Sequence, residues 1–276
     1  MTRKDLSTKD LELDKFDTDN NGDTIVRVKL SDPAFFLEVA KGNVPGHSLV
    51  HKFGRNNRID IANAEDIANI GGTYNFLTTA STIDVVSTNV NDTSVGSGAR
   101  TVTISGLDAN YDELVETVPM NGTTIVTTTG SFLRINTMSV ITAGTSGENE
   151  GDITAIDGSF TIAKIDAGIN RTQMAVYTIP NGKTGYLYDF SGSILPELNA
   201  IGVKEGDISL FIREIDSVFQ VRSDCALSTR GTSAAEFKLN PGPLRIPAKS
   251  DVKIRMIVRA NRVSASSTMD ILLVDN

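Results

Sequence analysis

From residue 82 onward, the chain consists of short segments of alternating apolar and polar residues separated by Gly, Asn, Asp and Pro. In residues 82–156 these segments read TIDVVS, RTVTIS, ELVETV, TTIVTTT, FLRINTMSVIT and GDITAI. A period of two between apolar positions is typical of a strand with one buried face, whereas a surface helix needs a period near 3.6. The pattern therefore predicts an all-β chain.

The C-terminal part continues this pattern in about eight further segments. They read SFTIAKI, TQMAVYTIP, TGYLYDFSGSI, DISLFIREI, SVFQVRS, SAAEFKL, LRIPAKSDVKIRMIVRA and STMDILLVDN. Their number and length favour a two-sheet sandwich of jelly-roll type. Within one of them, four apolar residues alternate with a mostly cationic set, which predicts one buried face and one charged face. The apolar residues are Val252, Ile254, Met256 and Val258, and the others are Lys253, Arg255, Ile257 and Arg259.

Three regions follow from the position of these signals. Residues 1–60 are predicted to form an N-terminal arm or docking segment, with a strand at TIVRVKL and a short helix that has Pro33 at its first position and ends before Gly42. Residues 61–158 are predicted to form an acidic β-sandwich-like domain, and residues 159–276 a C-terminal jelly-roll-like β-sandwich. The pairs Asn121-Gly122 and Asn181-Gly182 predict hairpin turns.

The charge of the chain is unevenly distributed. The net charge is −8, yet residues 61–170 contain 13 acidic and only 3 basic residues. Such a segment repels phosphate backbones, so no nucleic-acid partner is expected. The sequence has no apolar run of about 18 residues, and its charged start lacks the apolar core of a signal peptide. We therefore expect no membrane partner, and assembly in the cytoplasm of a host cell.

One segment near the N-terminus matches the first half of a calcium-binding loop. Residues 17–23 read DTDNNGD, with oxygen ligands at the first, third and fifth positions and glycine at the sixth. The twelfth position of such a loop carries a bidentate Glu, and here it is Val28. Two interpretations stay open: a solvated acidic turn before a strand, or a weak calcium site formed by Asp17, Asp19, Asn21 and Asp23. No other cofactor is expected.

The remaining motifs do not predict catalysis. The sequence Gly182-Lys183-Thr184 ends like a P-loop, but the required earlier glycine is Tyr177, so a turn is favoured. The two histidines lack the Glu of a metalloprotease motif, which favours a structural or interface role. Acidic residues in the middle domain could include the carboxylate pair of a glycosidase, although a solvated acidic face is favoured. These acidic residues include Asp108, Asp112, Glu113 and Glu116.

A docking surface is the remaining candidate site. The segment from residue 46 to 58 combines histidines, cations and one aromatic residue, and Arg55-Asn56-Asn57-Arg58 is suited to bind phosphate or carboxylate. Because the surrounding segment has the character of an arm, an assembly contact with an acidic partner is favoured. The predicted interface residues are His47, His51, Lys52, Phe53, Arg55 and Arg58.

Several stretches resemble a family of uncharacterised structural (virion) proteins of marine tailed bacteriophages. They lie at residues 46–56 (GHSLVHKFGRN), 91–124 (NDTSVGSGARTVTISGLDANYDELVETVPMNGTT), 131–155, 169–194 (INRTQMAVYTIPNGKTGYLYDFSGSI) and 246–276. Together they cover roughly residues 44–276. The resemblance implies a non-enzymatic component of the virion that is present in many copies.

These observations lead to one expected function and one alternative. The leading hypothesis is a virion structural protein on the particle surface, either a capsid decoration or a head-fibre-like component. The alternative is a tail subunit of the collar, baseplate or fibre adaptor, with receptor binding as one option for it. The expected partners are the major capsid protein or tail proteins and further copies of the chain in a trimer or ring. A host surface glycan is a further candidate, although the aromatic content of 6% is low for sugar binding.

Overall fold

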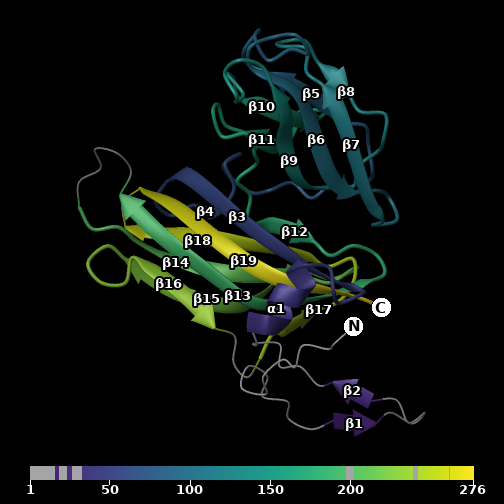
Figure 1. Ribbon diagram of the computed structural model, residues 1–276. Helices are drawn as coiled ribbons and strands as arrows, with labels where there is room; N and C mark the ends of the chain where they lie inside the picture. The colour runs from purple at the N-terminus through teal and green to yellow at the C-terminus, as the bar shows by residue number, and fades with distance from the viewer. Residues whose placement is uncertain (1–15, 19–23, 27–32, 197–201, 239–241, 261) are drawn as a thin grey trace. The chain divides into compact units, whose positions relative to one another are not determined.

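The computed structural model describes the chain except for residues 1–15, 19–23, 27–32, 197–201, 239–241 and 261 (Figure 1). The described residues form 19 strands and a single eight-residue helix, as the all-β prediction requires. The chain divides into two compact units, residues 1–49 and 50–276. Among the residues described, no helix has the length and apolar content needed to cross a bilayer.

The first unit contains a two-stranded sheet and one helix. Strands β1 (Phe16–Thr18) and β2 (Thr24–Val26) pair antiparallel, and α1 spans Pro33–Ala40. The helix begins at Pro33 as predicted, because proline lacks the N–H that a first helical residue leaves unbonded. It ends before Gly42, whose φ of 75° lies in the left-handed region. Within this unit, Phe35 packs edge-on against the ring of His47 at 5.9 Å.

Eight strands of the chain form a jelly roll. Taken in chain order, the first, eighth, third and sixth make one sheet (β3-β19-β13-β16), and the second, seventh, fourth and fifth make the other (β12-β18-β14-β15) (Figure 1). This is the strand order of two interleaved Greek keys, so the jelly-roll prediction is confirmed. The eight strands are β3 (His47–Ile59), β12 (Val176–Thr178), β13 (Lys183–Pro196), β14 (Glu205–Arg213), β15 (Gln220–Ser228), β16 (Ala234–Lys238), β18 (Asp251–Ala260) and β19 (Val263–Asp275).

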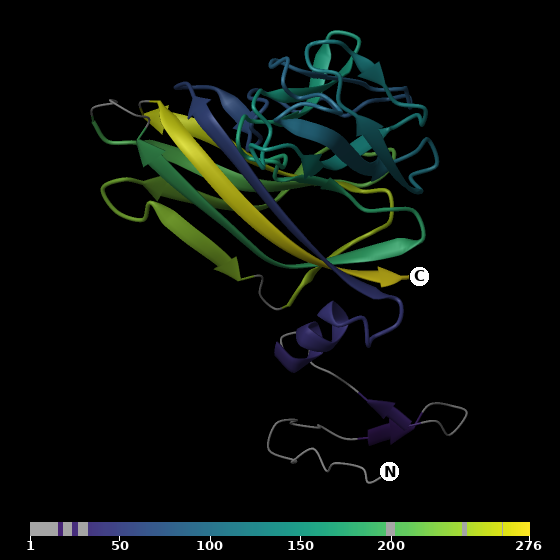
Figure 2. The same cartoon turned by 45° about the horizontal axis from the view of Figure 1, so that its top comes forward.

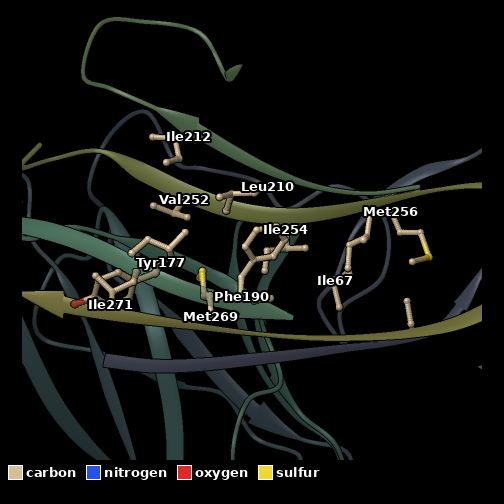
Figure 3. Close-up of a cluster of buried hydrophobic side chains, with 14 of the residues drawn as sticks. Ile67, Tyr177, Phe190, Leu210, Ile212, Val252, Ile254, Met256, Met269 and Ile271 are labelled. Atoms are coloured by element: carbon tan, nitrogen blue, oxygen red, sulfur yellow. The ribbon is translucent and has the colours of Figure 1, made fainter. Parts of the chain in front are cut away.

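Two short strands extend these sheets. Strand β4 (Ala64–Asp66) pairs with β18, and β17 (Leu244–Ile246) pairs with β13. The core lies between the two sheets, where Phe190 and Met269 from one sheet meet Leu210 and Ile254 from the other (Figure 3). On β18 the apolar residues of the predicted alternation all enter this core, as the period of two requires.

The residues between β4 and β12 form a second β-sandwich, which we call the inserted sandwich. It has a four-stranded sheet in the order β11-β10-β5-β8 and a three-stranded sheet in the order β7-β6-β9. Its own core includes Ile104, Phe132 and Ile153, each fully buried. The strands are β5 (Asp84–Ser87), β6 (Ala99–Leu107), β7 (Glu113–Pro119), β8 (Val126–Thr127), β9 (Arg134–Ala143), β10 (Ile153–Asp157) and β11 (Phe160–Ile165).

The inserted sandwich is joined to the jelly roll by a narrow neck. The Ala175 amide donates to the Ile67 carbonyl at 2.9 Å, and both residues pack in the jelly-roll core. The adjacent residues Ala68 and Met174 form a β-bridge and pack in the core of the inserted sandwich. Gly54 on β3 lies against this neck. A Cβ atom there would lie 2.1 Å from the Ile67 oxygen and 2.3 Å from the Ala175 nitrogen.

The first strand of the jelly roll comes from the segment whose sequence suggested an arm. Residues 47–59 form β3, which hydrogen-bonds to β19 near the C-terminus, and the two strands run side by side in Figure 2. The pairing buries Ile59 completely. The boundary expected at residue 158 falls within the β10–β11 hairpin, whose sheet continues to Ile165. The docking role of residues 1–60 stays a prediction.

The chain turns at both predicted sites, but neither turn connects two strands that pair with each other. The φ angles of Gly122 and Gly182 are 61° and 72°, in the left-handed region that glycine adopts readily in tight turns. However, β7 and β8 belong to different sheets, as do β12 and β13. The hairpin predictions are therefore wrong: each turn carries the chain from one sheet of a sandwich to the other.

Candidate functional site

The charged face of β18 is covered at its N-terminal end, from Asp251 to Lys253, and exposed at Ile257 and Arg259. Asp251 and Lys253 are 3% exposed, although their side chains alternate with core residues and therefore point away from the core. Their partners come from β4, from β14 and from the inserted sandwich. We call this group the buried charge cluster. It consists of Asp66, Arg134, Arg213, Asp251, Lys253 and Arg255.

Asp251 is the acceptor that joins the inserted sandwich to the jelly roll. Arg134 of β9 donates from Nε and Nη2 to its two carboxylate oxygens at 2.8 and 3.1 Å. Arg213 of β14 adds hydrogen bonds of 3.0 and 2.5 Å, and the Thr178 hydroxyl adds one of 2.6 Å. Burial lowers the pKa of Arg134, but the hydrogen bonds and charge of Asp251 outweigh it and raise the pKa overall. The Arg134 guanidinium thus stays protonated.

Asp66 organises the second half of the cluster. It is completely buried and accepts hydrogen bonds from Lys253 Nζ at 3.0 Å, Arg255 Nε at 2.9 Å and the Tyr74 amide at 2.8 Å. Burial lowers the pKa of Lys253, and the neighbouring charge of Asp66 offsets only part of this change. Because the removal of either partner would leave a charge buried alone, the cluster is a strong positional constraint.

Two aromatic rings complete the cluster. The Phe76 ring lies 5.2 Å from the Arg134 guanidinium and 4.9 Å from that of Arg213. The Phe219 ring lies 4.5 Å from Arg213 and 4.6 Å from Lys253 Nζ. The rings attract the cations through their negative faces while excluding water. Every charge in the cluster therefore has a partner within the chain, an arrangement that stabilises a scaffold.

A second feature is an open trough of about 550 Å³ on the outer face of the β16-β13-β19-β3 sheet. We call it the hydroxyl trough. Its floor is formed by hydroxyls of the two central strands, in cross-strand pairs: Ser191 with Thr268, and Ser193 with Ser266, each at 2.7 Å. Its walls are formed by Phe53 and Arg55 on β3, Gln173 beside them, and Glu236 on β16.

The alternation of β3 separates the predicted interface residues. His51 points outward and bonds Asp270 at 2.5 Å, and Phe53 and Arg55 line the hydroxyl trough. Lys52 points the other way, and its Nζ donates to the Asn136 carbonyl and, at 3.3 Å, to the Thr137 hydroxyl of the inserted sandwich. Burial, aided by the charge of Arg171, lowers the pKa of Lys52 to about 7.

The other predicted residues are spread over the chain. His47 bonds the Pro45 carbonyl at 2.8 Å, and Arg58 pairs with Asp60 at the surface. For the calcium prediction, Asp17 lies in β1, while Asp19, Asn21 and Asp23 lie outside the described residues. Within the described part of the chain, no group of three or more potential metal ligands comes together. The calcium site stays a prediction.

The four acidic residues considered as glycosidase candidates have structural partners. Asp108 accepts from the amides of Asn110 and Asp112, and Glu113 pairs with Lys183 at 3.4 Å. Asp112 accepts from the Asn181 side chain at 2.9 Å. Although burial raises the pKa of Glu116, hydrogen bonds from Thr129 and Gly130 outweigh it and lower the pKa overall. These contacts fix loops and turns of the inserted sandwich and its junction with the jelly roll.

The sequence did not reveal the buried charge cluster or the hydroxyl trough. The cationic alternation in 252–259 was visible, but its acidic partners lie far away in the chain, Asp66 above all. The sequence indicates the trough even less, because nothing distinguishes its serines from other polar residues on the solvent face of a strand.

Comparisons with known proteins give no family assignment. No protein-family model matches the chain, and no curated protein matches it. Among solved structures, the chain shows similarity to the VP2 subviral particle of infectious bursal disease virus, with 8% identity and a TM-score of 0.21 over 88% of this chain and 78% of that one. It also shows similarity to a triple jelly-roll turret protein of an archaeal virus, with 11% identity and a TM-score of 0.21 over 79% and 59% of the two chains. The jelly-roll assignment rests on the strand order itself.

Proposed function

We propose that the chain is a non-enzymatic structural protein of a bacteriophage virion, displayed on the particle surface as a capsid decoration or head-fibre-like component. The observation that carries the proposal is the construction of unit 50–276: a jelly roll joined to a second sandwich by ion pairs that bury part of one charged sheet face. Jelly rolls recur in viral coat proteins, and the sequence resemblance to phage virion proteins supports the same function.

The mechanism in this proposal is passive. Residues 1–60 would supply the contacts to the shell, and the acidic inserted sandwich would face solvent. Many weak contacts, multiplied by the number of copies, hold such a layer in place without a single tight site. The excess negative charge of residues 61–170 would keep neighbouring particles apart. Further copies of the chain, as a trimer or ring, and the major capsid protein are the proposed partners.

Particle imaging tests this function. Cryo-electron microscopy of virions that contain the chain should show its two sandwiches at repeated positions on the head, with residues 1–60 against the shell. Quantitative mass spectrometry of the same particles should give a copy number comparable with that of the major capsid protein. Density confined to the neck or tail, with a copy number typical of one closed ring, would contradict the decoration role.

A tail subunit that binds a receptor is the second candidate. The observation that favours it is the hydroxyl trough, which has the size of a ligand site. The charged side chains of its walls, Arg55 and Glu236, form no ion pair with any described residue. A decoration protein needs no such trough. Imaging that places the chain at the tail tip would therefore favour this candidate over the first.

A further inference from the structure

We propose that the hydroxyl trough binds a neutral oligosaccharide, a chain of uncharged hexose rings lying across the strands of the sheet. The proposal goes beyond the structural role. On the head it requires that the shell contacts of residues 1–60 come from the part before Phe53, which lines the trough. Three features of the trough support the proposal: the hydroxyls of its floor, the aromatic ring in one wall and the opposite charges of the two walls.

The floor offers donors and acceptors side by side. In each Oγ–Oγ pair one hydroxyl proton is used, so the second hydroxyl proton and the remaining lone pairs are available to a ligand. Sugar hydroxyls have the same double capacity. Because Ser191, Ser193, Ser266 and Thr268 are small, a ligand ring can approach the sheet closely.

The walls select against a charged ligand. Arg55 stands at the β3 edge of the sheet and Glu236 at the β16 edge, on opposite sides of the floor. Within the described residues, neither side chain forms a hydrogen bond or an ion pair. A ligand with a net charge would be attracted by one wall and repelled by the other. Neutral hydroxyls can accept from the guanidinium and donate to the carboxylate at the same time.

Phe53 supplies the apolar contact that a sugar ring needs. Its ring lines the trough, and the Arg171 guanidinium lies 5.6 Å from the ring centroid and restricts its orientation. The C–H face of a hexose can pack on such a ring while its hydroxyls reach the floor and Gln173. The volume of about 550 Å³ is within the range of small-molecule sites, about 300–1,000 Å³, and accommodates a few sugar rings.

Titration calorimetry with the full chain tests the proposal. The probes are maltohexaose, cellohexaose and mannohexaose, with trigalacturonate as the acidic comparison. We expect saturable binding of at least one neutral probe and none of trigalacturonate. Each of Phe53→Ala, Arg55→Ala and Glu236→Gln should weaken binding about tenfold, as expected for the loss of one good contact.

Matched controls separate the trough from general effects. Phe160→Ala and Arg58→Ala change exposed residues of the same types outside the trough, and should leave affinity unchanged. Ser193→Phe, which fills the floor, should abolish binding while the chain stays folded by circular dichroism. No saturable binding of any neutral probe, or equal affinity of the Phe53→Ala protein, would overturn the proposal.

Sedimentation of the same variants identifies the competing occupant. If no sugar binds and Arg55→Ala or Glu236→Gln changes the oligomeric state, the trough is a contact between copies of the chain and the glycan proposal fails. These measurements use the isolated protein. Failure of the sugar proposal is therefore distinguishable from failure of the virion role, which particle imaging tests.

Discussion

At the scale of single residues, Gly54 shows how little space the neck leaves. Any side chain there would meet the backbone of Ile67 and Ala175, which cannot move without displacing both connections to the inserted sandwich. We expect Gly54→Ala to destabilise the chain by about 1–3 kcal/mol or more, as overpacking does. Thermal unfolding followed by calorimetry measures the change. Gly231→Ala, at a position with no atom near the new Cβ, is the matched control and should be close to neutral.

Lys52 predicts a pH dependence of stability. Its pKa is about 7 in the folded chain and near 10.5 when unfolded, so between these values the unfolded state binds the extra proton. The free energy of unfolding should therefore rise with pH from about 7 to 10. Below pH 7 Lys52 is charged in both states, and the full cost of burying that charge lowers stability. Lys52→Met should remove this dependence and raise stability at pH 7 by roughly 2–4 kcal/mol.

Denaturant unfolding of the wild-type and Lys52→Met proteins at several pH values provides the check. The difference between the two curves isolates Lys52 from other titrating groups. Tyr74 and Tyr188, whose pKa values burial raises to about 12, titrate above the window. A difference that does not change between pH 7 and 10 would contradict the prediction.

At the scale of elements, β18 depends on partners from outside its own sheet. Replacing Asp251 by Ala would leave Arg134 buried without a counter-charge. We expect Asp251→Ala to cost about 3–5 kcal/mol, as the loss of one partner of a buried ion pair does. The exposed pair of Arg58 and Asp60 gives the comparison, since Arg58→Ala should change stability by less than about 1 kcal/mol. Equal effects of the two substitutions would contradict a stabilising role for the buried charge cluster.

The same strand shows what sequence can and cannot predict. The alternation from Val252 to Arg259 correctly gave a strand with one core face, because burial of one face depends only on local periodicity. It could not tell that Lys253 on the cationic face is buried as well, since that burial depends on Asp66 and on the other sandwich. Likewise, the turn at Gly182 was visible in the sequence, but the sheets of its two flanking strands depend on distant partners.

At the scale of the whole molecule, the class of fold was predictable and its connectivity was not. The number and spacing of the strands gave a jelly roll, and the strand order confirms it. Nothing local in residues 47–59 indicates pairing with 263–275, so the segment read as part of an arm. The sequence is linear, and a domain inserted into a connection divides its host into two pieces that periodicity cannot rejoin.

The narrow neck predicts that the inserted sandwich can be removed. Because the Ile67 carbonyl and the Ala175 amide are hydrogen-bonded at 2.9 Å, a short Gly-Ser linker can replace residues 68–174. The remaining jelly roll should fold, with a lower Tm because Asp251 loses Arg134. Circular dichroism should show β-rich secondary structure and a single cooperative transition. A product without a cooperative transition would contradict the independence of the two cores.

The pairing of β3 with β19 also determines the order in which the two sandwiches can fold during synthesis on the ribosome. Residues 68–174 are contiguous and contain every strand of the inserted sandwich, so this domain can fold as soon as it has emerged. The jelly roll must wait, since its first strand hydrogen-bonds to β19, the eighth jelly-roll strand in chain order. Until β19 emerges, the edge of β3 lacks this partner, and slow closure of the long-range contact leaves the nascent chain vulnerable to aggregation during that interval.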